Sequence, residues 1–291
     1  MAQINVKAYA KINTFLNVVK KREDSLHEIE SVMQTISLAD EILISTFESF
    51  GAEVSVSCVS GYAPDGEENI AYRAAKTYLE CANLTARVEI KLEKNIPSPA
   101  GLGGGSADAA AILRGLNQIF GKFDSYELQR IACLIGSDVP FCIKGGTKII
   151  KGIGDEIYAC DPMPCCYIAV ACGDGKMPTP LAYKTLDERY DDFNNLPSKR
   201  DINLFVEDIN SITKMSKGLY NIFEEVVSLE FPEVYDLKQI MVKNSAAGTL
   251  MSGSGTAVFG VFEDKNNALN AINEIKKLGM FTSLAIPVPE Y

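Results

Sequence analysis

Pro97-Ser-Pro-Ala-Gly-Leu-Gly-Gly-Gly-Ser106 is the stretch that decides the fold. It follows a predicted strand over residues 88–92 and precedes a predicted helix that Gly121 ends. Four of its last six residues are glycine, so the backbone can adopt positive φ angles and approach a ligand closely. A strand, a glycine-rich loop and a helix start together direct unpaired N–H groups outward, which is typical of an anion site, most often for phosphate. The Ser106 hydroxyl is predicted to cap the helix or to contact a magnesium ion.

The spacing of the glycines excludes the best-known phosphate loops. The chain contains no GxxxxGK[ST] sequence, so it has no Walker A loop, and Ser106 stands where a dinucleotide fingerprint needs its third glycine. The HRD and DFG motifs of eukaryotic-type protein kinases are also absent. The alternative interpretation of the stretch is a tight turn packed against a sheet.

Composition excludes several classes of function. The 291 residues include 28 Lys plus Arg and 38 Asp plus Glu, a formal net charge of −10, which disfavours a general nucleic-acid binder. His27 is the single histidine, so a Ser-His-Asp triad would have to use it, and a multi-histidine metal site within one chain is impossible. We therefore expect no nucleic-acid partner, although a single nucleotide is not excluded, because a few local backbone donors can bind its phosphate.

The cysteines and the apolar runs indicate a cytoplasmic protein. None of the eight cysteines forms a CxxC pair, and most have small or apolar neighbours, so we expect buried free thiols; disulfides or a metal site at Cys165 and Cys166 are the alternatives. Lys7 and Lys11 interrupt the only apolar stretch near the start, where a signal peptide needs an unbroken one. No uncharged apolar run approaches the roughly 20 residues of a membrane helix, so no membrane partner is expected.

Local signals predict the flanking elements. Apolar runs at 4–8, 15–19, 32–36 and 41–46 predict short strands. Asn69 is predicted to cap a helix that extends to about Cys81, and Asp124 with Glu127 has the spacing of a capping box. A second glycine-rich turn covers 251–256. The length favours two lobes, which we place at 1–155, with the phosphate loop, and at 156–291.

Four blocks of sequence together resemble one family. Residues 97–110 resemble the phosphate loop of the GHMP kinases, the small-molecule kinases that include galactokinase, homoserine kinase and mevalonate kinase. Ala10-Lys-Ile-Asn13, Gly136-Ser-Asp-Val-Pro140 and Ser252-Gly-Ser-Gly255 match further blocks in the same order over essentially the whole chain. The resemblance implies an α+β fold of two lobes with a ligand cleft between them.

Three segments resemble one branch of that family. Ala10-Lys-Ile-Asn13, His27-Glu-Ile-Glu-Ser31 and Pro178-Thr-Pro180 are most similar to the kinases that phosphorylate the 2-hydroxyl of 4-diphosphocytidyl-2-C-methyl-D-erythritol, a precursor in non-mevalonate isoprenoid synthesis. The alternatives are a related kinase that acts on homoserine or a mevalonate-type alcohol, and a nucleotide-binding sensor without catalysis.

The resemblance implies a role for each site residue. Asp138 is the general base, and Lys11 keeps Asp138 ionised and offsets charge on the transferred phosphoryl group. ATP enters with Mg²⁺, and no dedicated protein metal site is expected. Asn13 and Thr179 contact the methylerythritol, His27 hydrogen-bonds the cytosine, and Tyr183 stacks on it. The implied ATP-binding residues are Pro97, Ala100, Gly101, Leu102, Gly103, Gly104, Gly105 and Ser106 in the loop, with Asn69 and Lys94 near the adenine.

Each assignment has a plainer alternative. Lys11 and His27 are then surface residues, and Asp138 is a helix-terminal or turn residue. The remaining alternatives are a strand-end cap for Asn13, a core aromatic for Tyr183 and a plain helix cap for Asn69.

One segment departs from the branch. The related enzymes usually have Asp-Gly-Tyr-His where this chain has Asp24-Ser-Leu-His27. Ser25 makes a positive-φ turn less favourable than glycine would. Leu26 removes an aromatic partner for the base, and such stacking contributes about 1–3 kcal/mol. Tyr183 alone then stacks on the base, or the affinity is lower, or the substrate differs.

Overall fold

The computed structural model describes residues 1–61, 63–64, 66–190, 193 and 200–291. Contacts divide this part of the chain into two compact units. Unit 1 comprises Met1–Ala10, Leu38–Ser98 and Gly103–Lys144, and unit 2 comprises Lys11–Ser37, Pro99–Leu102 and Gly145–Tyr291. Neither unit is one continuous stretch, so these units differ from the two lobes expected from sequence. The assignment of ATP binding to a lobe at 1–155 stays a prediction.

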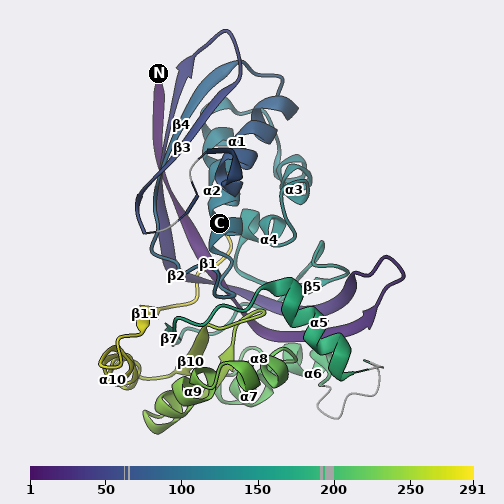
Figure 1. Ribbon diagram of the computed structural model, residues 1–291, viewed down its shortest axis with the longest axis vertical. Coiled ribbons are helices and arrows are strands. Elements are labelled where there is room, and N and C mark those ends of the chain that lie inside the picture. Colours follow the sequence, from purple (N-terminus) through teal and green to yellow (C-terminus); the bar gives the residue numbers. More distant parts are fainter. Residues whose placement is uncertain (62, 65, 191–192, 194–199) are drawn as a thin grey trace. The chain divides into compact units, whose positions relative to one another are not determined.

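Unit 1 contains helices packed on one face of a sheet (Figure 1). In β4 the side chains alternate between buried and exposed, as expected for a strand with one face covered. β4 pairs antiparallel with β2 through Glu41–Glu48 and parallel with β3. The elements of this unit, besides the first part of β1 and the last part of β2, are β3 (Glu53–Ser60), the short 3-10 helix η1 (Gly66–Glu68), α1 (Ile70–Cys81), β4 (Ala86–Glu93), α2 (Gly104–Phe120), α3 (Ser125–Cys133) and α4 (Val139–Lys144).

Helix α2 approaches the sheet closely because Gly115 has no side chain. A Cβ at this position would lie 2.6 Å from Cδ1 of Ile44 and 3.3 Å from Cγ1 of Val6. The buried residues of α2 are mostly alanine, with Ile112, Leu113 and Leu116. Small side chains let a helix approach a sheet closely, and the apolar area removed from water stabilises the packing. The helix that begins at the phosphate loop is therefore held firmly along its length.

Unit 2 contains a second, four-stranded sheet. Its order is β11-β7-β10-β9, and all its pairs are antiparallel. Helices α9 and α10 pack on this sheet. β2 also pairs with β5 through Ser31–Gln34, and β1 pairs with β8. The elements of unit 2, besides parts of β1 and β2, are β5 (Thr147–Lys151), β6 (Glu156–Ala159), β7 (Tyr167–Cys172), α5 (Thr179–Arg189), α6 (Ile202–Glu207), α7 (Ile212–Gly218), β8 (Tyr220–Asn221), α8 (Glu224–Glu230), α9 (Glu233–Lys243), β9 (Gly248–Met251), β10 (Val258–Phe262), α10 (Lys265–Lys276) and β11 (Phe281–Ala285).

Several local predictions are confirmed and others are wrong. Asn69 caps α1, the capping box at Asp124 is present, and Gly121 caps the end of α2. The short strands predicted at 4–8 and 15–19 form one strand, β1 (Ala2–Lys21), and those at 32–36 and 41–46 form β2 (His27–Glu48). All eight cysteines are free thiols, but not all are buried, because Cys81, Cys133 and Cys165 are exposed.

Candidate active site

Three of the four sequence blocks meet in unit 2. The Oγ atom of Ser252 donates a hydrogen bond to the carbonyl of Gly101 at 2.9 Å and accepts one from the N–H of Asn13 at 3.2 Å. The N–H of Lys11 donates to the carbonyl of Leu102 at 3.0 Å. The first half of the phosphate loop is therefore bound both to the second glycine-rich turn and to the strand that carries Lys11.

The loop fits here only because position 101 is glycine. Gly101 has φ +81°, and a Cβ would lie 2.0 Å from the carbonyl oxygen of Ser252. Ala100 and Leu102 are buried, and the carbonyl of Ala100 accepts a hydrogen bond from the N–H of Ala257 at 3.0 Å. Their side chains serve packing, so any contact of these two residues with phosphate would come from the backbone.

A chain of hydrogen bonds fixes the ammonium group of Lys11. The Nζ atom of Lys11, a residue with 4% exposure, donates to Oδ1 of Asn13 at 2.6 Å. The Nδ2 atom of Asn13 donates to Oγ of Ser31 at 2.8 Å, and Ser31 donates to the carbonyl of Phe15 at 2.6 Å. Lys11 is thus not the surface lysine of the plainer alternative. Asn13 orients it, a role that the sequence did not predict, and its contact with the substrate stays a prediction.

The second half of the loop starts helix α2 in unit 1. Gly103 is the N-cap with φ +69°, and Gly104 is the first helical residue. The prediction that Ser106 caps the helix is wrong, because Ser106 is the third residue of the helix. The first backbone N–H groups of a helix have no acceptor within it, and they carry the positive end of the helix dipole. Gly104, Gly105 and Ser106 therefore present donors suited to phosphate.

A buried ionic cluster lies beside this helix start. The Nζ atom of Lys94 contacts Oδ2 of Asp108 at 2.5 Å and also contacts Oδ2 of Asp40. Oδ1 of Asp40 accepts hydrogen bonds from the N–H groups of Asn95 at 2.5 Å and Ile96 at 2.8 Å. All three charged side chains are at most 5% exposed. The cluster therefore fixes both the segment that enters the phosphate loop and the helix that leaves it.

Asp108 is the member of this cluster whose buried negative charge is least compensated. Burial raises the pKa of Asp108, the ammonium of Lys94 lowers it only in part, and the charge of Asp40 raises it again, so the pKa is about 7. Among the described residues its Oδ1 atom has no hydrogen-bond partner. The sequence pattern indicated Lys94 but neither carboxylate, because nothing in it links position 40 to position 94. A contact of Lys94 with adenine stays a prediction.

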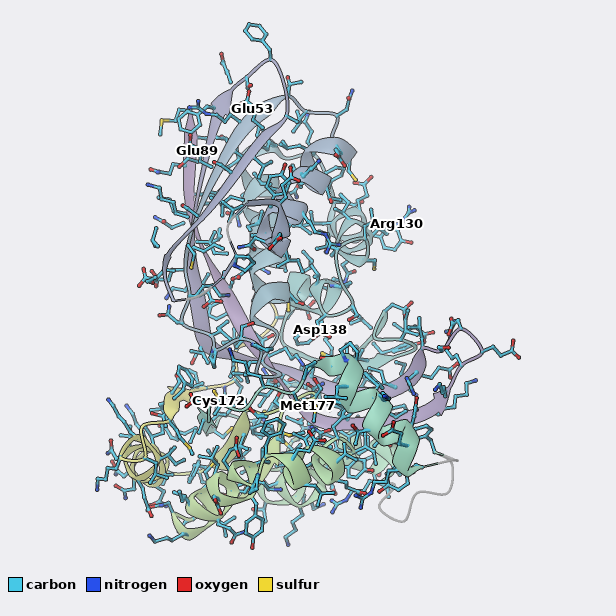
Figure 2. All side chains as sticks on the ribbon, in the orientation of Figure 1. Glu53, Glu89, Arg130, Asp138, Cys172 and Met177 are labelled. Carbon is cyan, nitrogen blue, oxygen red and sulfur yellow. The ribbon has the colours of Figure 1, made fainter. Side chains whose placement is uncertain are left out.

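Two other predicted residues of unit 1, Asn69 and Asp138, lie at helix starts, whereas Pro97 lies in the loop between β4 and α2. Oδ1 of Asn69 accepts from the N–H of Ala71 at 2.9 Å and Nδ2 donates to the carbonyl of Pro64 at 2.7 Å, so Asn69 is a helix cap. Asp138 is half-buried and directly precedes α4 (Figure 2). Lys11 belongs to unit 2 and Asp138 to unit 1, so their pairing stays a prediction.

His27, Tyr183 and Thr179 lie in unit 2. The rings of His27 and Tyr183 stack with centroids 4.6 Å apart, and Tyr183 also packs against Phe223. No base fits between two rings in contact, so a base would use another surface of Tyr183. Thr179 begins α5, and its Oγ1 atom lies 2.9 Å from Oγ of Ser254. The structure therefore connects two of the predicted substrate residues with each other and the third with the glycine-rich turn.

The turn that precedes His27 keeps the left-handed conformation without glycine. Ser25 has φ +67°, and its N–H donates to the carbonyl of Arg22 at 3.1 Å. Oδ1 of Asp24 accepts from the N–H of Leu26 at 3.1 Å, which stabilises the turn. Leu26 is 48% exposed. The substitution of serine for the usual glycine thus leaves the turn intact, while the aromatic partner is lost.

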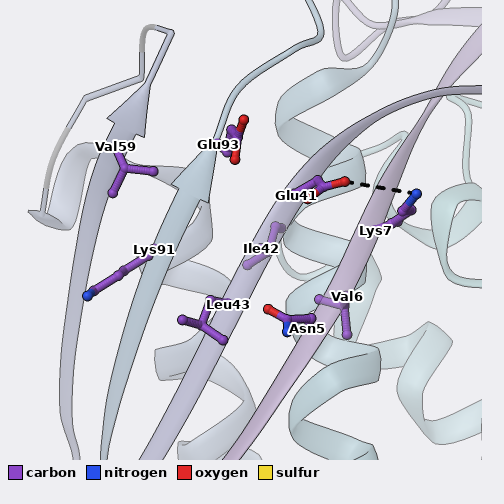
Figure 3. Close-up of a pocket in the computed structure, with 9 residues that line it drawn as sticks. All are labelled: Asn5, Val6, Lys7, Glu41, Ile42, Leu43, Val59, Lys91 and Glu93. Atoms are coloured by element: carbon purple, nitrogen blue, oxygen red, sulfur yellow. Dashed lines mark ion pairs between the residues drawn. The ribbon is translucent and has the colours of Figure 1, made fainter.

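A groove of about 330 Å³ lies elsewhere, on the face of the unit 1 sheet formed by β1, β2, β4 and β3 (Figure 3). Lys7 and Glu41 at its edge approach to 3.9 Å. None of the predicted site residues lines it.

Two features are absent from the described residues. No three or more His, Cys, Asp and Glu side chains there form a group able to hold a metal ion. No helix in those same ranges has both the length and the apolar character to span a membrane.

Comparison with known proteins supports one family. The family models described as GHMP kinases N terminal domain and GHMP kinases C terminal match residues 69–146 and 199–279. A 4-diphosphocytidyl-2-C-methyl-D-erythritol kinase from Caldicellulosiruptor bescii is 40% identical over 94% of this chain and 94% of its own length. Another enzyme of that name, from Acetivibrio thermocellus, is 37% identical over 95% of this chain and 96% of its own length.

Solved structures support the same fold, and one of them supports the same family. The crystal structure of a 4-(cytidine 5'-diphospho)-2C-methyl-D-erythritol kinase matches with a TM-score of 0.81 and 30% identity, covering 98% of this chain and 100% of that chain. A homoserine kinase from Cytophaga hutchinsonii matches with a TM-score of 0.75 and 18% identity, covering 100% of this chain and 96% of that chain, a likeness of fold alone. The α+β fold predicted from sequence is confirmed. The chain is an ATP-dependent kinase that belongs to the GHMP kinases, within the branch of the 4-diphosphocytidyl-2-C-methyl-D-erythritol kinases.

Proposed function

We propose that this chain transfers the γ-phosphoryl group of ATP to the 2-hydroxyl of 4-diphosphocytidyl-2-C-methyl-D-erythritol. The acceptor is the one named for the relatives that match almost the full length of the chain. The observation that carries the proposal is the buried ammonium of Lys11, held by Asn13, on a strand whose backbone binds the phosphate loop at Leu102.

Phosphoryl transfer needs positioning and charge neutralisation more than covalent chemistry. The N–H groups of Gly104, Gly105 and Ser106 would bind the phosphates, and the helix dipole would favour their charge. Lys11 would offset charge on the transferred group. The hydrogen bonds that fix its ammonium before ATP binds avoid reorganisation during the reaction.

Asp138 would accept the proton of the attacking hydroxyl. A general base of this kind contributes about 10²–10⁴-fold to the rate. ATP would enter with Mg²⁺, which supplies further charge neutralisation at the phosphates. The Ser106 hydroxyl, which caps no helix, is the side chain in the loop with the right chemistry to contact that ion.

A panel of acceptors tests the proposal. ATP consumption and phosphorylated product are measured with the cytidine diphospho-alcohol, homoserine and mevalonate as acceptors. The expected result is turnover with the cytidine compound only. Turnover only of an acceptor that has no cytidine group would refute the proposed substrate. Tight ATP binding without transfer to any acceptor would instead favour a nucleotide sensor.

A further inference from the structure

His27 makes a side-chain hydrogen bond that the proposed reaction does not use. It begins β2, and its Nε2 atom lies 2.7 Å from Oδ1 of Asp187 in α5. The other oxygen, Oδ2, accepts a hydrogen bond from Nζ of Lys21 at 2.6 Å. The three residues all belong to unit 2. Asp187 therefore uses one oxygen for each partner.

The charge of Asp187 decides where the histidine proton lies. Burial raises the pKa of Asp187, but the hydrogen bonds from Lys21 and His27 outweigh burial, and the pKa lies below its ordinary value. An ionised carboxylate has no hydrogen to donate, so Nε2 must carry the proton and donate it. In a neutral imidazole the other nitrogen, Nδ1, is then an acceptor.

The ring of His27 is also held in orientation. Its side chain is 7% exposed. Tyr183 stacks on one face with an interplanar angle of 27°, and Phe193 meets the ring at 88° with centroids 5.9 Å apart. A ring held on two sides cannot turn over to exchange its two nitrogens without disturbing its neighbours. The direction of Nδ1 and, in the neutral imidazole, its role as an acceptor are therefore set before any ligand binds.

We propose that Asp187 is a positioning residue that keeps the proton of His27 on Nε2, so that Nδ1 accepts a hydrogen bond from the 4-amino group of cytosine and disfavours uracil. The inference rests on the proposed function, because it takes His27 as the residue that contacts the base. Cytosine presents an amino donor at position 4, whereas uracil presents a carbonyl acceptor there. With uracil, Nδ1 of His27 and the 4-carbonyl oxygen would face each other as two acceptors. Neither would have a hydrogen-bond donor, which costs free energy when both are removed from water.

Asp187→Asn tests the inference because Lys21 and His27 both bind the side chain of Asp187. Lysine has only donors, so it would take the oxygen of the new amide and leave the –NH₂ group facing Nε2. Nε2 must then accept, and the proton of a neutral imidazole moves to Nδ1. In the double variant Asp187→Asn/Lys21→Met the amide is free to turn its oxygen toward Nε2, which restores the original tautomer. Lys20→Met is the matched control, because Lys20 pairs with Glu28 at 3.1 Å instead.

The tautomer can be measured without any substrate. His27 is the only histidine of the chain, so ¹⁵N-histidine labelling gives the signals of one imidazole. Two-bond ¹H–¹⁵N correlations at about pH 8, above the ordinary histidine pKa, distinguish the two tautomers. We expect protonated Nε2 in the wild type, in Lys20→Met and in the double variant, and protonated Nδ1 in Asp187→Asn. The same tautomer in all four proteins would overturn the inference.

Base selectivity is the second measurement. It is the ratio of kcat/KM for the cytidine diphospho-alcohol to that for its uridine analogue. We expect Asp187→Asn to lower this ratio about 10- to 100-fold, the double variant to recover most of it, and Lys20→Met to leave it unchanged. An equal ratio in all four proteins would refute the inference alone. No turnover of either compound by the wild type would refute the proposed function.

Discussion

At position 101 the chain has no room for a side chain. Gly101→Ala would place a methyl group 2.0 Å from the backbone of Ser252 at a φ of +81°. Backbone atoms cannot move aside cheaply, so we expect the loop to separate from the glycine-rich turn, with kcat/KM lowered at least about 100-fold. Steady-state kinetics and thermal unfolding measure the effect.

Gly121→Ala is the control for backbone strain alone. Gly121 also has a positive φ, +61°, but nothing lies within 4 Å of a Cβ there. It should cost about 1–2 kcal/mol of stability and leave kcat/KM of the folded protein unchanged. Equal kinetics in the two variants would show that the contact of Gly101 with Ser252 does not position the loop.

Asp138→Asn tests the proposed general base. The amide keeps the size of the side chain but cannot accept a proton, so kcat should fall about 10²–10⁴-fold. ATP affinity, measured by calorimetry, should stay within a few-fold. Asp124→Asn is the control, because asparagine caps a helix as well as aspartate does and Asp124 serves only the capping box of α3. Unchanged turnover in Asp138→Asn would refute the role of Asp138.

At the scale of the elements, local signals predicted the helices better than the strands. Asn69, Gly121 and Asp124 act within a few residues of their own position, so their roles follow from spacing. The strands β1 and β2 were predicted as shorter pieces because β1 continues through Lys11 and Asn13. Polar residues usually mark the end of a buried strand. Here they are buried because they bind one another and distant segments.

The cluster of Lys94, Asp40 and Asp108 makes the stability of unit 1 depend on pH. An unfolded chain loses the proton of Asp108 near pH 3.9, whereas the folded chain keeps it until about pH 7. Between these values the folded state binds more protons, so this group's contribution to the free energy of unfolding falls as pH rises. Its stabilising effect is complete below about pH 3.9 and is lost as pH passes about 7.

Asp108→Asn removes this dependence. We expect the free energy of unfolding of the variant to fall less than that of the wild type between about pH 5 and 8. Chemical denaturation at several pH values measures the difference. Glu93→Gln, an exposed carboxylate on β4, should behave like the wild type. Parallel curves for the wild type and Asp108→Asn would mean that the pKa of Asp108 is not raised.

At the scale of the whole molecule, the four blocks gave the family and the fold but not the contacts. Ser252 lies 151 residues from Gly101, and His27 lies 160 residues from Asp187. Such pairs depend on how distant strands and helices pack, which no spacing within one segment reveals. The burial of Lys11, its hydrogen bond to Asn13 and the contact of His27 with Asp187 therefore became visible only in the folded chain.

The choice of acceptor tests the proposed function of the whole molecule most directly. The measurement is kcat/KM for ATP-dependent phosphorylation of 4-diphosphocytidyl-2-C-methyl-D-erythritol, beside homoserine and mevalonate, with the product identified by ³¹P NMR. We predict one new phosphate ester, on the 2-hydroxyl of the cytidine compound, and no detectable product from the other two. Phosphorylation of homoserine or mevalonate with the cytidine compound left unchanged would contradict the proposed function.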